Sequence, residues 1–172
     1  MNVALLTAQD AKRYRALMLQ AYEQVADAFT SSVEERAAEP ESWWVERICG
    51  PEKDKAAFGA FVDGELVGTV ALAFSHRAKT QHRAALIGMF VLPGSRGCGL
   101  GRALLEAAAK HALARGGVQT LVLTVTEGNA SAIELYEAFG FERFGSEPMA
   151  IRTAGGYKAK VHMWKRLSDS GA

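Results

Sequence analysis

The chain has 172 residues, 49% of them hydrophobic and 23% charged, a composition typical of a globular domain with a sizeable core. Its 20 lysines and arginines are nearly balanced by 19 aspartates and glutamates, so the charge gives no support for a nucleic-acid-binding protein. No apolar run approaches the length of a membrane span, and the apolar stretch near the start is too short for a signal peptide.

The cysteine content favours a protein without metal or disulfides. Cys49 and Cys98 are too few and too far apart in the sequence for a metal cluster or a disulfide framework. We therefore expect reduced thiols, no metal and a cytoplasmic protein without membrane partners. The length predicts a single domain over residues 1–167, followed by a frayed tail at 168–172.

The first quarter of the chain predicts one strand and two helical regions. Residues 3–7 form a short apolar run typical of a strand. Apolar residues then recur at three- and four-residue steps from 14 to 28, which predicts a helix. A second helical region is expected over 30–51, with Ser32 as its N-cap and Pro40 restarting it.

The pattern then changes to that of strands. Residues 55–75 predict a hairpin around Asp63-Gly64, the strongest short turn signal. Residues 83–93 are apolar on both faces, which predicts a central strand, and Gly88 within it is a candidate bulge. In the second strand of the hairpin we expect one face to carry Leu66, Val70, Leu72 and Phe74.

The second half alternates helices and strands. The sequence predicts a helix over 99–115, a strand over 118–127, a helix over 129–140 capped by Asn129, and closing strands at 141–147 and 157–167. The resulting order is β-α-α-β-β-β-α-β-α-β-β. It predicts an α/β fold built on a mixed sheet of about seven strands, with helices on both faces.

The turn that leads into the helix at 99–115 is rich in glycine and reads Arg96-Gly97-Cys98-Gly99-Leu100-Gly101. A P-loop would continue with Lys and Ser or Thr, but Arg102 and Ala103 follow. A dinucleotide fingerprint would need glycine in place of Arg102 and an opening βαβ unit. Two interpretations remain: a tight turn without a ligand, or a turn whose N–H groups converge on an anion at the helix N-terminus.

In the second interpretation Gly99 and Gly101 leave room for a diphosphate, and Arg96 and Arg102 add positive charge beside it. The stretch resembles the acetyl-CoA signature of the GCN5-related N-acetyltransferase (GNAT) family, in which a strand ending in V-x-P, here residues 91–93, precedes Q/R-x-x-G-x-G/A. Residues 123–145 also resemble the downstream element of that family.

The resemblance covers about residues 55–167, with a compatible start, and it implies a GNAT-like fold with acetyl-CoA as co-substrate. It implies that backbone on residues 89–91 pairs with the pantetheine arm and that an N–H there polarises the thioester carbonyl. The implied acetyl-CoA-binding residues are Met89, Phe90, Val91, Arg96, Gly97, Cys98, Gly99, Leu100, Gly101, Arg102 and Asn129.

The same resemblance implies that Tyr136 is the general acid that protonates the sulfur of CoA. Asn129 and Tyr136 are seven residues apart, about two helical turns, and so lie on nearly the same face of the predicted helix. Two structural alternatives stay open: Asn129 serves only as an N-cap, and Tyr136 only covers the core.

The general base is not assigned. The central strand carries no carboxylate, whereas many relatives place one there. His76, His82, Glu127 or a chain of water molecules could accept the proton, and we name none of them as catalytic. Cys98 at a helix N-terminus could be a nucleophile, but no histidine or acid stands beside it in the sequence, so we interpret it as a small residue that the turn tolerates.

The acceptor is also left open. Residues 23–54 hold nine acids, which could favour a cationic amine, although we prefer a solvated helix face. Trp43 and Trp44 could form a pocket wall, with one of them in the core. The closing hairpin resembles that of a branch acting on amino acids, peptide N-termini or amine drugs, but Ala159-Lys160 replaces its acidic pair, so no acceptor preference is carried over.

The sequence therefore predicts an enzyme, an acetyl-CoA-dependent N-acetyltransferase acting on a primary amine of a small molecule, an amino acid or a peptide N-terminus. A homodimer is possible. The alternatives are a non-catalytic acyl-CoA sensor of the same fold and a transferase of a longer acyl group.

Overall fold

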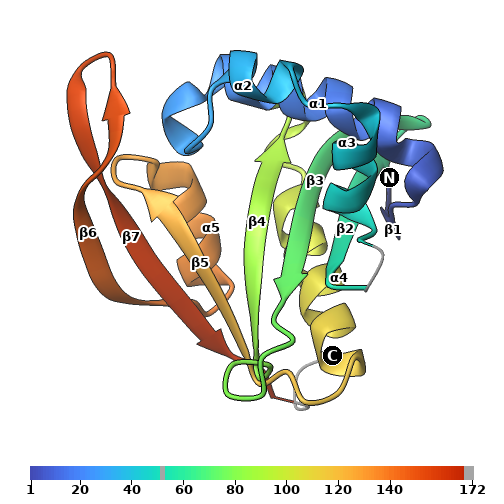
Figure 1. Ribbon diagram of the computed structural model, residues 1–172, viewed down its shortest axis with the longest axis vertical. Helices are drawn as coiled ribbons and strands as arrows, with labels where there is room; N and C mark the ends of the chain where they lie inside the picture. Colours follow the sequence, from blue (N-terminus) through green and yellow to red (C-terminus); the bar gives the residue numbers. More distant parts are fainter. Residues whose placement is uncertain (51–52, 169–172) are drawn as a thin grey trace.

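A computed structural model describes residues 1–50 and 53–168. Its seven strands form one sheet in the order β1-β2-β3-β4-β5-β7-β6 (Figure 1). Neighbouring strands are antiparallel except β4 and β5, which are parallel. The strands are β1 (Asn2–Leu5), β2 (Lys55–Val62), β3 (Glu65–Phe74), β4 (Arg83–Val91), β5 (Thr120–Thr126), β6 (Glu142–Thr153) and β7 (Gly156–Arg166).

Helices cover both faces of this sheet, as the sequence predicts. On one face lie α1 (Ala11–Gln24) and α3 (Glu41–Ile48), with the short α2 (Val33–Ala37) beside α1. On the other lie α4 (Leu100–Ala114) and α5 (Ala130–Ala138). Three short 3₁₀ turns stand at Ala8–Asp10, Ala26–Ala28 and Pro93–Ser95. The predicted element order and the mixed α/β fold class are confirmed.

The second predicted helical region is divided into α2 and α3. The side chain of Ser32 accepts a hydrogen bond from the N–H of Glu35, and the Glu35 carboxylate accepts one from the N–H of Ser32, so this capping box starts α2. Pro40 then has an extended conformation, with ψ near 163°, and α3 begins directly after it. Proline cannot donate to a preceding carbonyl, which explains the break between the two helices.

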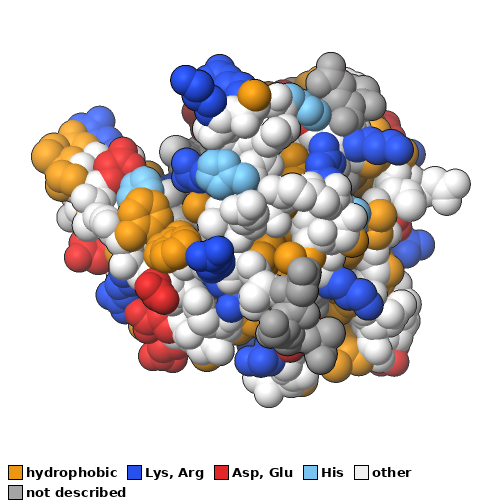
Figure 2. Space-filling model, turned by 90° about the horizontal axis from the view of Figure 1, so that it is seen from below, with side chains coloured by type: hydrophobic (Ala, Val, Ile, Leu, Met, Phe, Trp, Pro, Cys, Tyr) orange, Lys and Arg blue, Asp and Glu red, His pale blue; other side chains and the backbone are white. Residues whose placement is uncertain are grey.

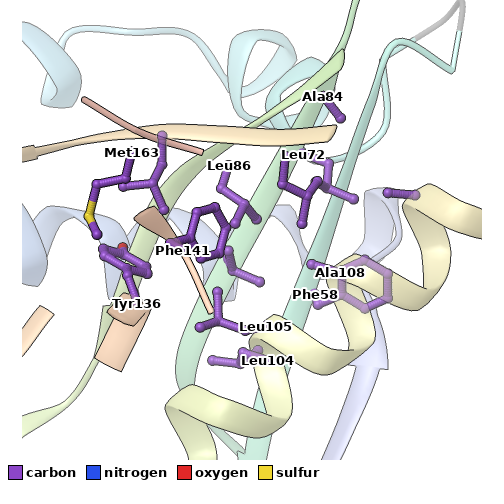
Figure 3. Packing of buried hydrophobic residues seen from close by; sticks show 14 of the residues in the cluster. Phe58, Leu72, Ala84, Leu86, Leu104, Leu105, Ala108, Tyr136, Phe141 and Met163 are labelled. Atoms are coloured by element: carbon purple, nitrogen blue, oxygen red, sulfur yellow. The ribbon is translucent and has the colours of Figure 1, made fainter. Parts of the chain in front are cut away.

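Two apolar clusters hold the helices to the sheet. The larger lies under α4 and α5, and Figure 3 shows Leu104, Leu105 and Ala108 of α4 facing Leu72 and Leu86 of the sheet. The buried residues of α4 recur at three- and four-residue steps, so a single stripe of the helix is covered. The smaller cluster, under α1 and α3, contains Tyr14, Met18, Trp44 and Ile48.

A bulge in the hairpin of β2 and β3 corrects one prediction. Ala60 pairs with Gly68 and Phe61 with Leu66, so Val67 is an extra residue in β3. Side chains on either side of a bulge change faces. Leu66 therefore packs in the cluster under α1 and α3, whereas Val70 and Leu72 pack in the cluster under α4 and α5. The prediction that all of them share one face is wrong for Leu66.

A second bulge, in β4, opens the sheet. Thr69 pairs with Phe90 and Ala71 with Ile87, which leaves Gly88 and Met89 opposite one residue of β3. Gly88 has a φ of 61°, a conformation that favours glycine, and its prediction as a bulge is confirmed. β4 pairs with β5 only over residues 83–85, and Figure 1 shows the two strands diverging beyond that point.

On the face in Figure 2, the basic side chains stand in separate groups and do not merge into one patch. Within the described ranges, no helix has the length and hydropathy required to cross a membrane. The hairpin of β6 and β7 carries exposed Phe144, Met149 and Tyr157. Of the predicted tail at 168–172, residues 169–172 lie outside the described residues.

Candidate functional site

The glycine-rich turn points its backbone into open space. Gly97 and Gly99 have φ values of 80° and 82°, and a Cβ atom added to either would meet nothing within 4 Å. Only glycine adopts this conformation readily. In the described part of the chain no hydrogen bond reaches the N–H groups of residues 97–102, while Ala103 N–H donates to the carbonyl oxygen of Gly99 as α4 begins.

A cavity of about 500 Å³ lies in front of these N–H groups. Free N–H groups at the start of a helix, together with the helix dipole, form an anion-binding site. Of the residues that the sequence predicts to bind acetyl-CoA, all except Cys98 line this cavity: Met89, Phe90, Val91, Arg96, Gly97, Gly99, Leu100, Gly101, Arg102 and Asn129.

The two arginines of the turn differ in what they contact. Arg96 donates from Nε to the carbonyl oxygen of Val91 at 2.9 Å, so this side chain braces the end of β4. Arg102 forms an exposed ion pair with Glu106, also at 2.9 Å, one helical turn along α4. An exposed pair of this kind is weak. The Arg102 guanidinium is therefore the one more readily available to an anion.

Gly101 and Cys98 each make a contact that the sequence does not predict. A Cβ at Gly101 would stand 2.9 Å from Cδ2 of Leu135, so this glycine allows α4 to pack closely against α5, and it also lines the larger cavity. Cys98 is exposed, lines neither cavity of the site, and donates from Sγ to the carbonyl oxygen of Ser95 at 3.0 Å. Its place in the turn supports the interpretation of a tolerated small residue.

A second cavity, of about 240 Å³, adjoins the first where β4 and β5 separate. Gly88 on β4 and Thr124 on β5 line it from the two strands. Residues of the connection between α1 and α2 also line it. The two cavities share six lining residues: Ala28, Phe29, Met89, Asn129, Ala132 and Leu135. A ligand in the larger cavity can therefore extend into the smaller one.

Asn129 and Tyr136 both line this second cavity, at opposite ends of α5. The side chain of Asn129 caps the helix by accepting from the N–H of Ala132 at 3.4 Å. Tyr136 is 7% exposed and packs edge-on against Phe141, with 5.8 Å between ring centroids (Figure 3). Burial raises the pKa of its hydroxyl, so the Tyr136 phenol is neutral at physiological pH.

None of the candidate bases lines either cavity. His76 and His82 lie between the end of β3 and the start of β4, at the end of the sheet where β4 and β5 are still paired. Glu127 follows β5, is exposed, and donates its backbone N–H to Ala159. The structure thus favours none of the three side chains as the general base.

The second cavity has positively charged walls, which the sequence did not indicate. Its lining includes Arg36, Arg47 and Lys160 and contains no Asp, Glu or His among the described residues. The acids of the 23–54 segment lie elsewhere: most are exposed, Glu39 and Asp54 are half-buried, and Glu52 lies outside the described residues. No signal in the linear sequence links Arg36 and Arg47 to Lys160, because they come together only in the fold.

Trp43 and Trp44 take different positions. The sequence predicts that one of them lies in the core, and Trp44 does. Trp44 is 1% exposed and belongs to the core under α1 and α3. Trp43 is half-buried and contacts the arginines rather than lining the cavity. Within the described residues no group of three or more His, Cys, Asp or Glu side chains is arranged to hold a metal ion.

Comparison with known proteins gives the same family that the sequence of the turn resembles. The family model of the acetyltransferase (GNAT) family matches residues 18–141. Streptothricin acetyltransferase from Streptomyces lavendulae is 39% identical over 93 residues, which are 54% of this chain and 47% of that protein. The chain spans less than half the length of the curated relatives that it matches.

Solved structures agree over nearly the whole chain. Ribosomal-protein-alanine N-acetyltransferase from Brucella melitensis has a TM-score of 0.79 at 24% identity, over 97% of this chain and 100% of that one. The protein yncA from Salmonella typhimurium, solved with acetyl-CoA, has a TM-score of 0.78 at 18% identity, over 100% and 96%. At these identities the structures establish the fold. With the family model covering most of the chain, this protein belongs to the GNAT family of acetyltransferases.

Proposed function

We propose that the protein transfers an acetyl group from acetyl-CoA to a primary amine, with Tyr136 as the proton donor to the departing sulfur. The observation that carries this proposal is the continuity of the two cavities. One lies in front of the free N–H groups of residues 97–102, and the other contains Tyr136. A donor held by its diphosphate at the turn can thus reach a proton donor between the separated strands.

The residues of the larger cavity fit acetyl-CoA. The free N–H groups and the guanidinium of Arg102 suit a diphosphate, which carries negative charge on several oxygens. Beyond Ala85 the edge of β4 that faces β5 is unpaired, so backbone groups on that edge near residues 89–91 can hydrogen-bond an extended pantetheine arm. The carbonyl oxygen of Val91 already accepts from Arg96. When bound, acetyl-CoA supplies a thioester that an amine can attack and a sulfur that leaves as a thiolate.

Tyr136 supplies the proton that such a thiolate needs. Tyr136 lines the second cavity, and its phenol is protonated at physiological pH, as that of an ordinary tyrosine is. A side-chain base is not required at the second cavity, because the charges of Arg36, Arg47 and Lys160 disfavour an ammonium ion there and lower its pKa. The released proton then passes to water, the alternative that the sequence left open.

The acceptor is a primary amine of a small molecule, an amino acid or a peptide N-terminus. The name of the curated relative, streptothricin acetyltransferase, supports a small molecule.

Both cysteines are free thiols, which supports the prediction of a cytoplasmic protein. The exposed apolar residues on the hairpin of β6 and β7 support the prediction of a homodimer, which light scattering would test.

The test is thiol release from acetyl-CoA in the presence of pooled amines, with wild-type protein and Tyr136→Phe. We expect kcat to fall by about 100-fold or more, the usual contribution of a general acid, while the Kd of acetyl-CoA stays within about threefold. Tyr157→Phe, at an exposed tyrosine of the β6–β7 turn, is the matched control and should leave both values unchanged.

The outcomes distinguish the alternatives. Unchanged turnover of Tyr136→Phe removes Tyr136 from the mechanism. If acetyl-CoA binds but no amine accelerates thiol release, the chain is a sensor rather than an enzyme. A higher kcat/KM with a longer acyl-CoA than with acetyl-CoA would assign the third alternative, transfer of a longer acyl group.

A further inference from the structure

The second cavity contains three cationic side chains from separate parts of the chain. Arg36 lies in α2, Arg47 in α3 and Lys160 in β7, and all three line the cavity that also contains Gly88 and Tyr136. No carboxylate lines it among the described residues. A cleft lined by charges of one sign attracts ligands of the opposite sign.

Protein groups neutralise these charges only in part. Arg36 reaches Glu39 at 3.5 Å through Nη1 and donates to Ser31 Oγ through Nη2, but its buried Nε has no hydrogen-bond partner. Lys160 donates to the hydroxyl of Thr30 at 2.8 Å. Partial burial lowers the pKa of its ammonium group, and the charge of Glu147, its pairing partner on β6, opposes that shift. Arg47 forms no ion pair with any described carboxylate. The cavity therefore keeps an excess of positive charge.

An aromatic ring holds the two arginines in place. The guanidinium carbons of Arg36 and Arg47 lie 4.5 and 5.5 Å from the ring centroid of Trp43. Cation–π contacts restrain both side chains and reduce the entropy lost when they bind a ligand. Two like charges held close to one ring repel each other, and an anion near both of them relieves that repulsion.

A buried hydroxyl stands beside Arg47. A Cβ at Gly88 would be 3.5 Å from Tyr14 Oη and 4.0 Å from Arg47 Nη2, so both groups lie next to this cavity-lining glycine. Tyr14 is fully buried, which raises the pKa of its hydroxyl, and the neighbouring guanidinium of Arg47 partly offsets that rise. A donor and a guanidinium together suit an oxyanion.

We propose that the amine acceptor carries an oxyanion near its amine, as an α-amino acid does, and that Arg36 and Arg47 bind this oxyanion with Lys160 on the facing wall. This inference rests on the proposed function and specifies the acceptor class of the same site. The shared chemistry is a primary amine with a carboxylate, phosphonate or phosphinate. The same charges disfavour polyamines and other acceptors with a second cationic group.

The first experiment needs no variant. Thiol release from acetyl-CoA is measured with α-amino acids, their carboxamides, aminophosphonates and polyamines, with side chains matched where the compounds allow. We expect kcat/KM to fall by about 10- to 100-fold when the carboxylate is replaced by an amide, the loss typical of one or two hydrogen bonds between charged groups. Comparing carboxylates with phosphonates identifies the oxyanion.

The second experiment uses Arg47→Met, with Arg47→Lys as the conservative variant. We expect Arg47→Met to raise KM for the anionic acceptor by about 10-fold or more, with partial recovery in Arg47→Lys and an unchanged Kd for acetyl-CoA. Arg152→Met is the matched control, because Arg152 lies over the ring of Tyr157 at 5.9 Å on the exposed hairpin. It should leave KM unchanged.

Failure of this inference is distinct from failure of the proposed function. If amides or polyamines are acetylated as well as or better than the amino acids, the protein is a transferase but the anionic acceptor is wrong. A rise in the Kd of acetyl-CoA with Arg47→Met also overturns the inference, because the arginine then serves the donor. If no amine accelerates thiol release, the proposed function itself fails.

Discussion

The glycine-rich turn and the cationic cavity adjoin each other but are built differently. The turn is one continuous segment, residues 96–102, whose conformation follows from its own glycines. The cavity takes its charged walls from α2, α3 and β7, and Arg36 and Lys160 are 124 positions apart in the sequence. The first can be identified in the sequence, because local backbone chemistry defines it. The second exists only when the sheet brings distant segments together.

The comparison also suggests that the turn and the cavity have separate roles, one in donor binding and the other in acceptor choice. The turn offers backbone N–H groups, which recognise any diphosphate regardless of the acyl group or the acceptor. The cavity offers side chains, which substitution can change without disturbing the fold. We therefore expect variants of the turn to affect donor binding with every acceptor, and variants of the cavity to change which acceptor is used.

The largest effect expected at the turn comes from Gly99→Ala. A φ of 82° is costly for alanine, so the turn must shift or strain, and its N–H groups then lose their common direction. We expect the Kd of acetyl-CoA to rise by about 10-fold or more, the loss of one hydrogen bond to a charged group, whatever the acceptor. Isothermal titration measures it.

Gly64→Ala is the matched control for this change. Gly64 has a φ of 84° and, like Gly99, open space around its missing Cβ, but it lies in the turn between β2 and β3. Both variants should lose about 1 kcal/mol of stability from backbone strain. An equal loss of acetyl-CoA affinity in both would show that the effect is global and would remove the special role of the turn.

A smaller effect, on stability alone, separates the buried tyrosines from an exposed one. Burial raises the pKa of Tyr14 and of Tyr136. Above about pH 10 each phenol ionises in the unfolded chain before it does in the folded one, so the free energy of unfolding falls as pH rises. Tyr14→Phe should reduce this slope by up to about 1.4 kcal/mol per pH unit in urea titrations between pH 9 and 11.5.

Tyr157→Phe supplies the comparison for the alkaline slope, because Tyr157 is 54% exposed. Its slope should match that of the wild type. A Tyr14→Phe slope equal to that of the wild type would mean that the phenol reaches water in the folded protein, and the packing next to Gly88 would then differ from the one described.

The smallest effect is expected from the acidic residues around the cavity. Glu34 and Glu46 are exposed and line neither cavity. Changing each to glutamine should alter the KM of any acceptor by less than about twofold, since screened surface charges act weakly at a distance. A selective loss of cationic acceptors in these variants would instead support the interpretation in which the acids attract the amine.

Local signals account for what could be predicted. Asn129 before an apolar helix, Gly88 within an apolar strand and Pro40 within a helical region each act on their own neighbourhood, and the structure agrees at each. The prediction for Leu66 failed because the bulge at Val67 arises from how β2 and β3 pair, which no residue of β3 signals alone. The contact between Gly101 and Leu135 could not be predicted either, because it joins two helices.

The sequence by itself determined the family, the order of the elements and the turn before α4, because periodicity, caps and glycines act over a few residues. The tertiary structure decided how β4 and β5 separate, that none of the three candidate bases lines a cavity, and that Arg36, Arg47 and Lys160 line the same cavity. Charge in a cavity is a sum over segments distant in the chain. These segments, and so their charges, come together only when the sheet has folded.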